Sequence, residues 1–149
     1  MLSKPVVYNA LREELDLRKS RIEESLSDSL KSMTRETKSS AGDKHETSRA
    51  MAQLEQEKLS SQLSNATQLR GIITGINPEE EHTEIQFGSL IQLDQNWYFL
   101  SVGMGSMMVG NTKVFCLSAA TPLGRVLLKK KLGDEVSFNG KSMKISHLK

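Results

Sequence analysis

Between two long helical stretches the chain reads Ser39-Ser40-Ala41-Gly42-Asp43-Lys44-His45-Glu46-Thr47. The segment consists of small and polar residues, which favour a break in helical structure. Two helices of similar length joined by a short turn pack antiparallel. The sequence therefore predicts a helical hairpin that has this segment, residues 39–47, at its tip and that presents Asp43 and Glu46 there.

The composition fits one ordinary domain or two small ones. Hydrophobic residues make up 37% of the 149 residues and aromatic residues 5%, which indicates an elongated molecule with much solvated surface. The formal net charge is only +2, so net charge gives no reason to expect strong binding of nucleic acid. A local basic face, with a weak contact to DNA, stays open.

The single cysteine, Cys116, cannot form an internal disulfide, and this suits a reducing compartment. We expect a small, packed side chain there. The N-terminal residues lack the apolar core of a signal peptide. No apolar run approaches the roughly 20 residues that span a bilayer. The sequence therefore predicts a soluble, cytoplasmic protein without a membrane partner.

Apolar residues mark one face of a first helix, which we expect to begin near Tyr8 after a short lead-in that contains Pro5. Charged residues fill the positions between them, so the helix is solvated on its other sides and needs a partner. The apolar stripe follows helical spacing and consists of Leu11, Leu15, Ile22, Leu26, Leu30 and Met33.

A second helix is expected from Glu46 to about Leu69, with Gly71 as its stop. At about 1.5 Å per residue, a helix that spans residues 11–38 is on the order of 40 Å long. The hairpin is therefore much longer than it is wide. Its candidate inner positions in the second helix are Met51, Leu54, Leu59, Leu63, Ala66 and Leu69.

After residue 70 the pattern changes to short runs of β-branched and aromatic residues between turn residues. Residues 103–106 are expected to form a loop, and Asn139-Gly140 a two-residue hairpin turn. Thr121 as a cap and Pro122 at the first position predict a short helix that ends at Lys131. The expected strands are residues 71–76, 83–87, 90–93, 97–102, 112–117, 135–138 and 141–148.

The fold class that follows is α+β. Residues 1–70 form an N-terminal antiparallel helical hairpin, or coiled coil. Residues 71–149 form a globular domain in which an antiparallel sheet packs on one short helix.

The pair Asp43 and Glu46 has two interpretations. As a capping box, each side chain bonds the other residue's backbone N–H and stabilises the second helix by about 1 kcal/mol. As metal ligands, two carboxylates three residues apart on one helix face share a divalent cation. Mg²⁺ prefers six oxygens, so the pair forms only half a site. His45 between them is a candidate ligand or proton carrier, although an exposed histidine in a polar turn is usually neither.

Three motifs, in this order, resemble the Gre family of bacterial transcript-cleavage factors. The tip Gly42-Asp43-x-x-Glu46 is similar to the family's Gly-Asp-Leu-x-Glu-Asn-Ala-Glu-Tyr. The run Gly88-Ser89-Leu90-Ile91-Gln92-Leu93 resembles the family's strand opening Phe-Gly-(Ala/Ser)-x-Val-x-Leu. The third motif is the most specific, Leu117-Ser118-Ala119-Ala120-Thr121-Pro122-Leu123-Gly124-Arg125-Val126-Leu127-Leu128-Lys129 with Gly133-Asp134-Glu135-Val136. It is similar to Ser-Pro-(Ile/Leu)-(Ala/Gly)-(Arg/Lys)-Ala-Leu-x-Gly-Lys followed by Gly-Asp-x-Val.

The resemblance implies a coiled coil followed by an FKBP-like globular domain, and RNA polymerase as the partner. The globular domain would dock at the rim of the polymerase's secondary channel through the loop at Thr121 and Pro122, while the coiled coil enters the channel. Asp43 and Glu46 would help hold the second Mg²⁺ of the polymerase's own active site, where backtracked nascent RNA is cut and its 3′ end realigned. The protein would then be no enzyme by itself, and we expect a monomer when it is free.

One departure from the family motif leaves an alternative open. Thr47-Ser48-Arg49-Ala50 stands where the family has Asn-Ala-Glu-Tyr, so an acidic residue is replaced by Arg49. This favours a non-cleaving secondary-channel binder that regulates RNA polymerase. Peptidyl-prolyl isomerase activity, suggested by the FKBP-like fold, and a role as a coiled-coil adaptor are further hypotheses.

Overall fold

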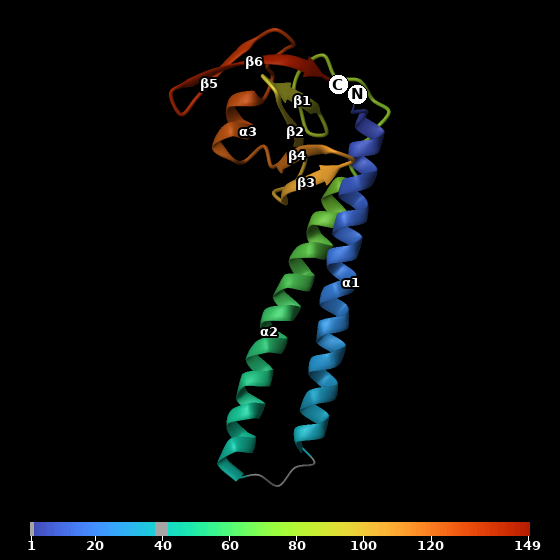
Figure 1. Cartoon of the computed structure of the whole chain (residues 1–149), viewed down its shortest axis with the longest axis vertical. Coiled ribbons are helices and arrows are strands. Elements are labelled where there is room, and N and C mark those ends of the chain that lie inside the picture. Colours follow the sequence, from blue (N-terminus) through green and yellow to red (C-terminus); the bar gives the residue numbers. More distant parts are fainter. Residues whose placement is uncertain (1, 38–41) are drawn as a thin grey trace. The chain divides into compact units, whose positions relative to one another are not determined.

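The computed structural model describes residues 2–37 and 42–149, with the side chains of all of these except 33–37 and 42–45. The predicted break at residues 39–41 lies outside the described residues. The chain divides into two compact units, one of residues 13–71 and one of residues 1–12 with 72–149. Figure 1 follows the chain through both. The start of the first helix therefore groups with the C-terminal half of the sequence.

Two long helices come first, α1 (Lys4–Thr37) and α2 (Gly42–Ile73) (Figure 1), and they confirm the predicted pair of helices. Helix α1 begins earlier than expected, before Pro5 and not near Tyr8. Proline fits the first helical turn, where backbone N–H groups have no partner within the helix. Pro5 therefore belongs to α1.

The end of α2 corrects the sequence prediction. The helix passes Gly71 and ends at Ile73, so the strand expected at residues 71–76 is wrong, as is the stop at Gly71. Ile73 and Ile76 are both buried, and a spacing of three fits helical geometry instead of the alternation of a strand. The Gly75 and Ile76 N–H groups donate to the carbonyls of Ile72 and Ile73 and close this end.

The hairpin unit has a small apolar core of its own. Buried Ile22 of α1 meets Leu59 and Ala66 of α2, and half-buried Leu26 and Leu63 pack against them. These five residues confirm the central part of both predicted stripes.

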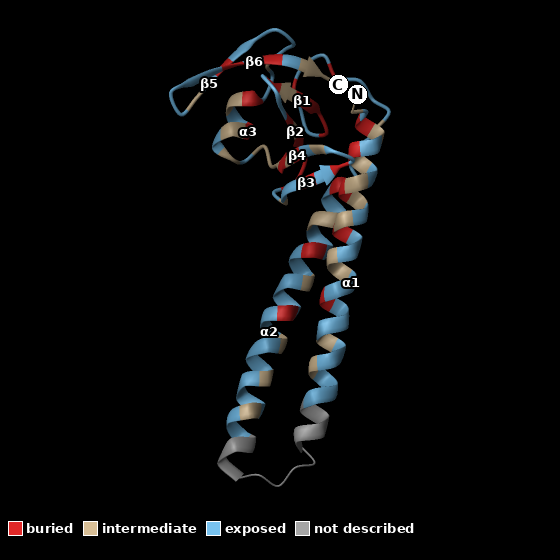
Figure 2. Ribbon diagram, viewed as in Figure 1, coloured by how far each residue is buried: buried red, intermediate tan, exposed pale blue. Residues whose placement is uncertain are grey.

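The apolar stripe does not continue as predicted toward the connection between the two helices. Leu30, Met51 and Leu54 are 56%, 66% and 65% exposed, so their assignment to the interior is wrong. The five-residue step from Leu54 to Leu59 explains part of this, because it turns the two side chains about 140° apart around the helix. Among the residues of this part whose side chains the structure describes, Figure 2 marks none as buried in either helix.

The second unit contains a sheet of six strands within the described residues. The strand order is β3-β4-β2-β1-β6-β5. Neighbours are antiparallel except β2 and β4, which run parallel with Trp97 opposite Val114. The expected antiparallel sheet is therefore mixed. The strands are β1 (Leu90–Leu93), β2 (Asn96–Leu100), β3 (Gly105–Val109), β4 (Thr112–Leu117), β5 (Glu135–Phe138) and β6 (Lys141–Leu148).

Two other strand assignments change. Strand β3 begins at Gly105, inside the segment expected to be a loop, and it forms one edge of the sheet. Residues 83–87 form no strand. Instead the backbone of Ile85 exchanges hydrogen bonds with Lys129 and Lys130, at N···O distances of 2.9 and 2.8 Å. Ile85 is almost fully buried, so its apolar character anchors a loop.

Both faces of the sheet are covered. Helix α3 (Pro122–Leu127) lies on one face, where it helps to enclose the main core. On β2, Tyr98 and Leu100 point toward this core, so the alternating residues Trp97 and Phe99 point to the other face, where they are buried too. The buried residues of the main core are Ile85, Ile91, Leu93, Leu100, Leu127, Val136, Met143 and Ile145.

Candidate functional site

Helix α2 begins at Gly42, which places Asp43 and Glu46 three residues apart at the start of this helix. Glu46 is exposed. The side chains of Asp43 and His45 lie outside the described residues, so the capping box and the role of His45 stay predictions. Asp43 and Glu46 both lie in the first turns of α2, where the helix dipole is positive and a negative charge stabilises the helix.

The donor chemistry of this pair fits Mg²⁺ only in part. Carboxylate oxygens are the ligands that this ion prefers, but two side chains leave most of its six positions to other groups. In the part of the chain that the structure describes, no three His, Cys, Asp or Glu side chains gather as a metal site. A magnesium site at Asp43 and Glu46 would need further oxygens from another molecule.

The loop before α3 has the geometry that its sequence predicts. Thr121 is the N-cap of α3, and its hydroxyl oxygen accepts from the Gly124 N–H at 3.1 Å. The same hydroxyl donates to the Ser118 carbonyl at 2.8 Å. Pro122 follows in the first turn and is exposed. Because the Thr121 hydroxyl bonds both Ser118 and Gly124, the backbone of the loop is fixed where Pro122 is exposed.

Gly124 is required where α3 begins. A Cβ atom at this position would collide with the Ser118 carbonyl and come within 2.9 Å of Ala119 Cα. Both are backbone atoms, so neither can move without displacing the loop. Helix α3 also ends sooner than expected, at Leu127 and not at Lys131, because Lys129 adopts a positive φ of 68° and pairs with Ile85.

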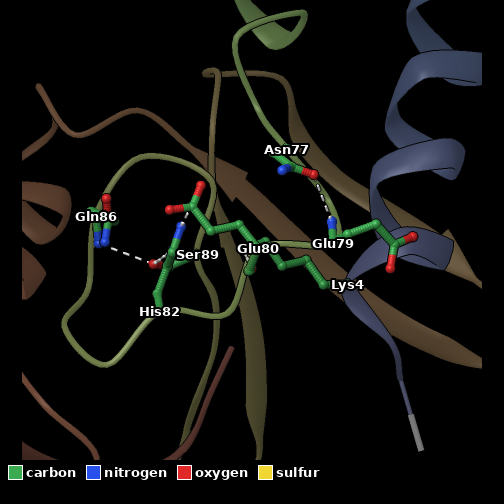
Figure 3. A network of polar contacts seen from close by, with 7 residues as sticks. All are labelled: Lys4, Asn77, Glu79, Glu80, His82, Gln86 and Ser89. Carbon is green, nitrogen blue, oxygen red and sulfur yellow. Dashed lines mark hydrogen bonds and ion pairs between the residues drawn. The ribbon is translucent and has the colours of Figure 1, made fainter.

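A buried polar network joins the start of α1 to the loop between α2 and β1 (Figure 3). Lys4 is 3% exposed, and its Nζ donates to the Glu80 carbonyl at 2.6 Å. His82 Nδ1 lies 2.7 Å from Ser89 Oγ, which also accepts from the Gln86 N–H at 3.0 Å. His82 Nε2 lies 3.9 Å from a Glu80 carboxylate oxygen. Sequence reasoning missed this network, because Lys4 is 76 positions from Glu80 and meets it only in the fold.

The environment of His82 favours the neutral imidazole. Burial lowers the pKa of His82 below its ordinary value of 6.5, and the Lys4 ammonium lowers it further, against the opposing effect of Glu80. Burial also lowers the pKa of Lys4, with Glu80 and Glu81 opposing. Because Ser89 Oγ already accepts one N–H, its own proton is free to be donated to neutral His82 Nδ1. The network therefore holds together with His82 uncharged.

Cys116 confirms the expectation of a packed side chain. It is 3% exposed in β4, and burial raises the pKa of its thiol to about 12, with a hydrogen bond to Ser101 acting in the other direction. Since the thiolate is the reactive form, this thiol is chemically inert at neutral pH.

No protein-family model matches the chain, and no curated protein does. A crystal structure of GreA factor homolog 1 (Gfh1) of Thermus thermophilus shares 17% sequence identity, with 93% of this chain and 94% of that chain covered, at a TM-score of 0.37. A structure of the transcription factor Gfh1 shares 16% identity over 93% and 94% of the two chains, at a TM-score of 0.39. Scores this low decide neither family nor function. None of the described helices is both long and apolar enough to cross a membrane.

Proposed function

We propose that this chain is a transcription elongation factor that enters the secondary channel of bacterial RNA polymerase and stimulates cleavage of backtracked nascent RNA. The observation that carries the proposal is the pair Asp43 and Glu46 at the start of α2, in a hairpin of two helices with 34 and 32 residues. The resemblance of this tip, and of two further motifs, to the Gre family names the partner.

The length of α2 suits this role. At about 1.5 Å per residue, its 32 residues span about 48 Å. A helix of this length carries its first turn far from its last, so the acidic pair can enter a narrow channel ahead of the rest of the hairpin. In the hairpin near this end, the exposed Leu30, Met51 and Leu54 offer apolar surface to channel walls.

At the polymerase active site the two side chains act as oxygen donors. Asp43 and Glu46 would supply carboxylate oxygens and negative charge to the metal site, where the polymerase's own ligands are too few. The second Mg²⁺, when bound, stabilises the attacking and leaving oxygens of the phosphoryl displacement. Asp43 and Glu46 need neither to accept a proton nor to form a covalent bond. The chain is therefore an activator and not an enzyme.

The loop at Thr121 and Pro122 is proposed to dock at the channel rim. Its two hydrogen bonds to Ser118 and Gly124 fix the backbone before any partner binds. A rigid contact loop loses little conformational entropy on association. RNA polymerase is then the stable partner, the 3′ end of nascent RNA is met only inside the complex, and the free protein is a monomer.

The experiment is RNA cleavage in a stalled, backtracked elongation complex of the matching polymerase with Mg²⁺. The wild-type chain should release short 3′ fragments, and Asp43→Asn/Glu46→Gln should not, although it binds the complex equally well. Glu55→Gln/Glu57→Gln is the matched control, because both residues are exposed on the same helix and the charge change is the same. If the control loses cleavage and the tip variant keeps it, the proposal is wrong.

One observation favours a second candidate, a channel binder that regulates the polymerase without cleavage. Arg49 is exposed three residues after Glu46, a spacing that puts both on one side of the helix. Its positive charge there would oppose a metal ion at the Glu46 carboxylate. This candidate predicts slower elongation and no 3′ fragments with the wild-type chain. Arg49→Glu would then create the missing cleavage activity.

A further inference from the structure

The apolar stripe of α1 contains one cation. From Leu15 to Ile22 the stripe skips a full seven residues, and regular spacing of four and three residues would place an apolar side chain at position 18. Arg18 stands there and is half-buried. A charged residue at a seam position lowers the stability of a helical hairpin, so a compensating interaction is expected.

Arg18 borders a hollow of about 510 Å³ on the hairpin unit. Arg21 lies three residues later on the same helix face. In the part of the chain that the structure describes, neither arginine forms a hydrogen bond or ion pair with another residue. Other cations of this unit do, since Lys19 pairs with Glu23 and Arg70 with Asp16. The hollow is lined by Glu14, Arg18, Arg21, Ile22, Gln62 and Asn65.

We propose that this hollow binds a free nucleotide through its phosphates. Two guanidinium groups with unused N–H donors match phosphate oxygens, to which arginine donates in pairs. A bound phosphate also neutralises the charge of Arg18, which the protein leaves half-buried and unpaired.

The other groups in the hollow distinguish a nucleotide from inorganic phosphate. Glu14 repels an anion but accepts hydrogen bonds from ribose hydroxyls, as acidic residues do in other nucleotide sites. The amides of Gln62 and Asn65 both donate and accept, as the edge of a base requires. The volume lies in the range of sites for small organic ligands, about 300–1,000 Å³. The site uses none of the residues proposed for cleavage or docking. It can be tested without polymerase, so its failure is distinct from a failure of the proposed function.

The test is calorimetric titration of the full chain, at low salt and without polymerase, with GTP, inorganic triphosphate and a short oligoribonucleotide. GTP should bind at least about tenfold more tightly than triphosphate, because only GTP uses Glu14 and the amides. Glu14→Gln should remove this difference. No binding of GTP overturns the proposal, and so does tighter binding of the oligoribonucleotide than of GTP.

Three variants test whether GTP binds in this hollow. Arg18→Leu restores the apolar stripe, so it should fold with an unchanged or higher melting temperature and bind GTP at least about tenfold more weakly. Arg21→Gln, at an exposed position, should weaken binding with no change in melting temperature. Lys58→Gln removes an exposed cation of α2 outside the hollow and should bind as the wild type does. Equal affinity of Arg18→Leu and wild type would place the ligand elsewhere and refute the assignment.

Discussion

His82 makes the sheet unit sensitive to acid. Its pKa is lowered by burial and by Lys4, so the unfolded chain takes up a proton at His82 at a higher pH than the folded chain. The contribution of neutral His82 to the free energy of unfolding is therefore complete above about pH 6.5. It is lost as the pH falls from there through the lowered pKa of His82 in the folded state. We predict that the wild-type chain loses melting temperature over this interval and that His82→Asn loses less.

Thermal unfolding between pH 8 and pH 5, followed by circular dichroism, measures this difference. His147→Asn is the necessary second variant, because burial and Lys149 lower the pKa of His147 too. The melting temperature of His147→Asn should still fall with pH by the amount that His82 causes. Parallel curves for wild type and His82→Asn would contradict the assignment.

The cap of α3 gives a prediction for the docking loop. Thr121→Ala removes the hydroxyl that bonds both Ser118 and Gly124, and it should cost about 1 kcal/mol of the free energy of unfolding. Thr121→Ser keeps the hydroxyl and should cost much less. Under the proposed function, Thr121→Ala also weakens binding to polymerase, which a competition assay measures. Equal stability of the alanine and serine variants would show that the cap contributes nothing.

The cap of α3 could be predicted from the sequence because it depends on contacts between near neighbours. Contacts between residues far apart in the chain could not be predicted. Thr121 and Pro122 act on neighbours within three residues, so the cap can be recognised along the chain. Lys4 and Glu80 are 76 positions apart, and no sequence pattern connects them. Arg18 lies between these cases. The seven-residue step from Leu15 to Ile22 is visible in the sequence, but its meaning depends on a hollow to which α2 contributes two of the six lining residues.

At the scale of elements, the two helices of the hairpin pack over only part of their length. Leu59 lies in the small core with Ile22 and Ala66, whereas Met51 is 66% exposed. Leu59→Ala should lower the free energy of unfolding by about 2–3 kcal/mol, because it removes buried methyl groups and leaves a cavity. Met51→Ala should change it by less than about 0.5 kcal/mol.

Urea denaturation of both variants measures the contrast, with the wild type as reference. Comparable losses for the two would mean that the helices pack along their whole length, as the apolar stripe of the sequence predicted. A loss for neither would mean that the Ile22 core does not stabilise the hairpin.

The strands wrongly expected at residues 71–76 and 83–87 share one physical cause. Apolar residues at the junction after α2 are buried by tertiary contacts, and burial alone does not select a strand. Ile73 and Ile76 are buried at the end of a helix, and Ile85 is buried in a loop. Sequence patterns for strands work where local turns fix the register. Asn139 and Gly140, with φ of 52° and 75°, form the predicted turn between β5 and β6.

At the scale of the whole molecule, the fold class of two long helices followed by a sheet with a short helix could be predicted from the sequence, and the parallel pairing of β2 and β4 could not. A parallel pair depends on how the chain crosses over. Here the connection contains β3, and the first two residues of that strand, Gly105 and Ser106, lie in the segment expected to form a loop. The sequence predicts the acidic pair as a site because carboxylates at a hairpin tip have a chemical use. Under the proposed function, its role depends on a partner that supplies the other metal ligands.

The measurement that tests this role most directly is the rate of transcript cleavage as a function of Mg²⁺ concentration in a backtracked elongation complex. If Asp43 and Glu46 supply metal ligands, the wild-type chain lowers the Mg²⁺ concentration needed for half-maximal cleavage. Asp43→Asn/Glu46→Gln then leaves it at the value of polymerase alone. An unchanged Mg²⁺ dependence with the wild-type chain bound would contradict the account and leave the acidic pair as a helix cap.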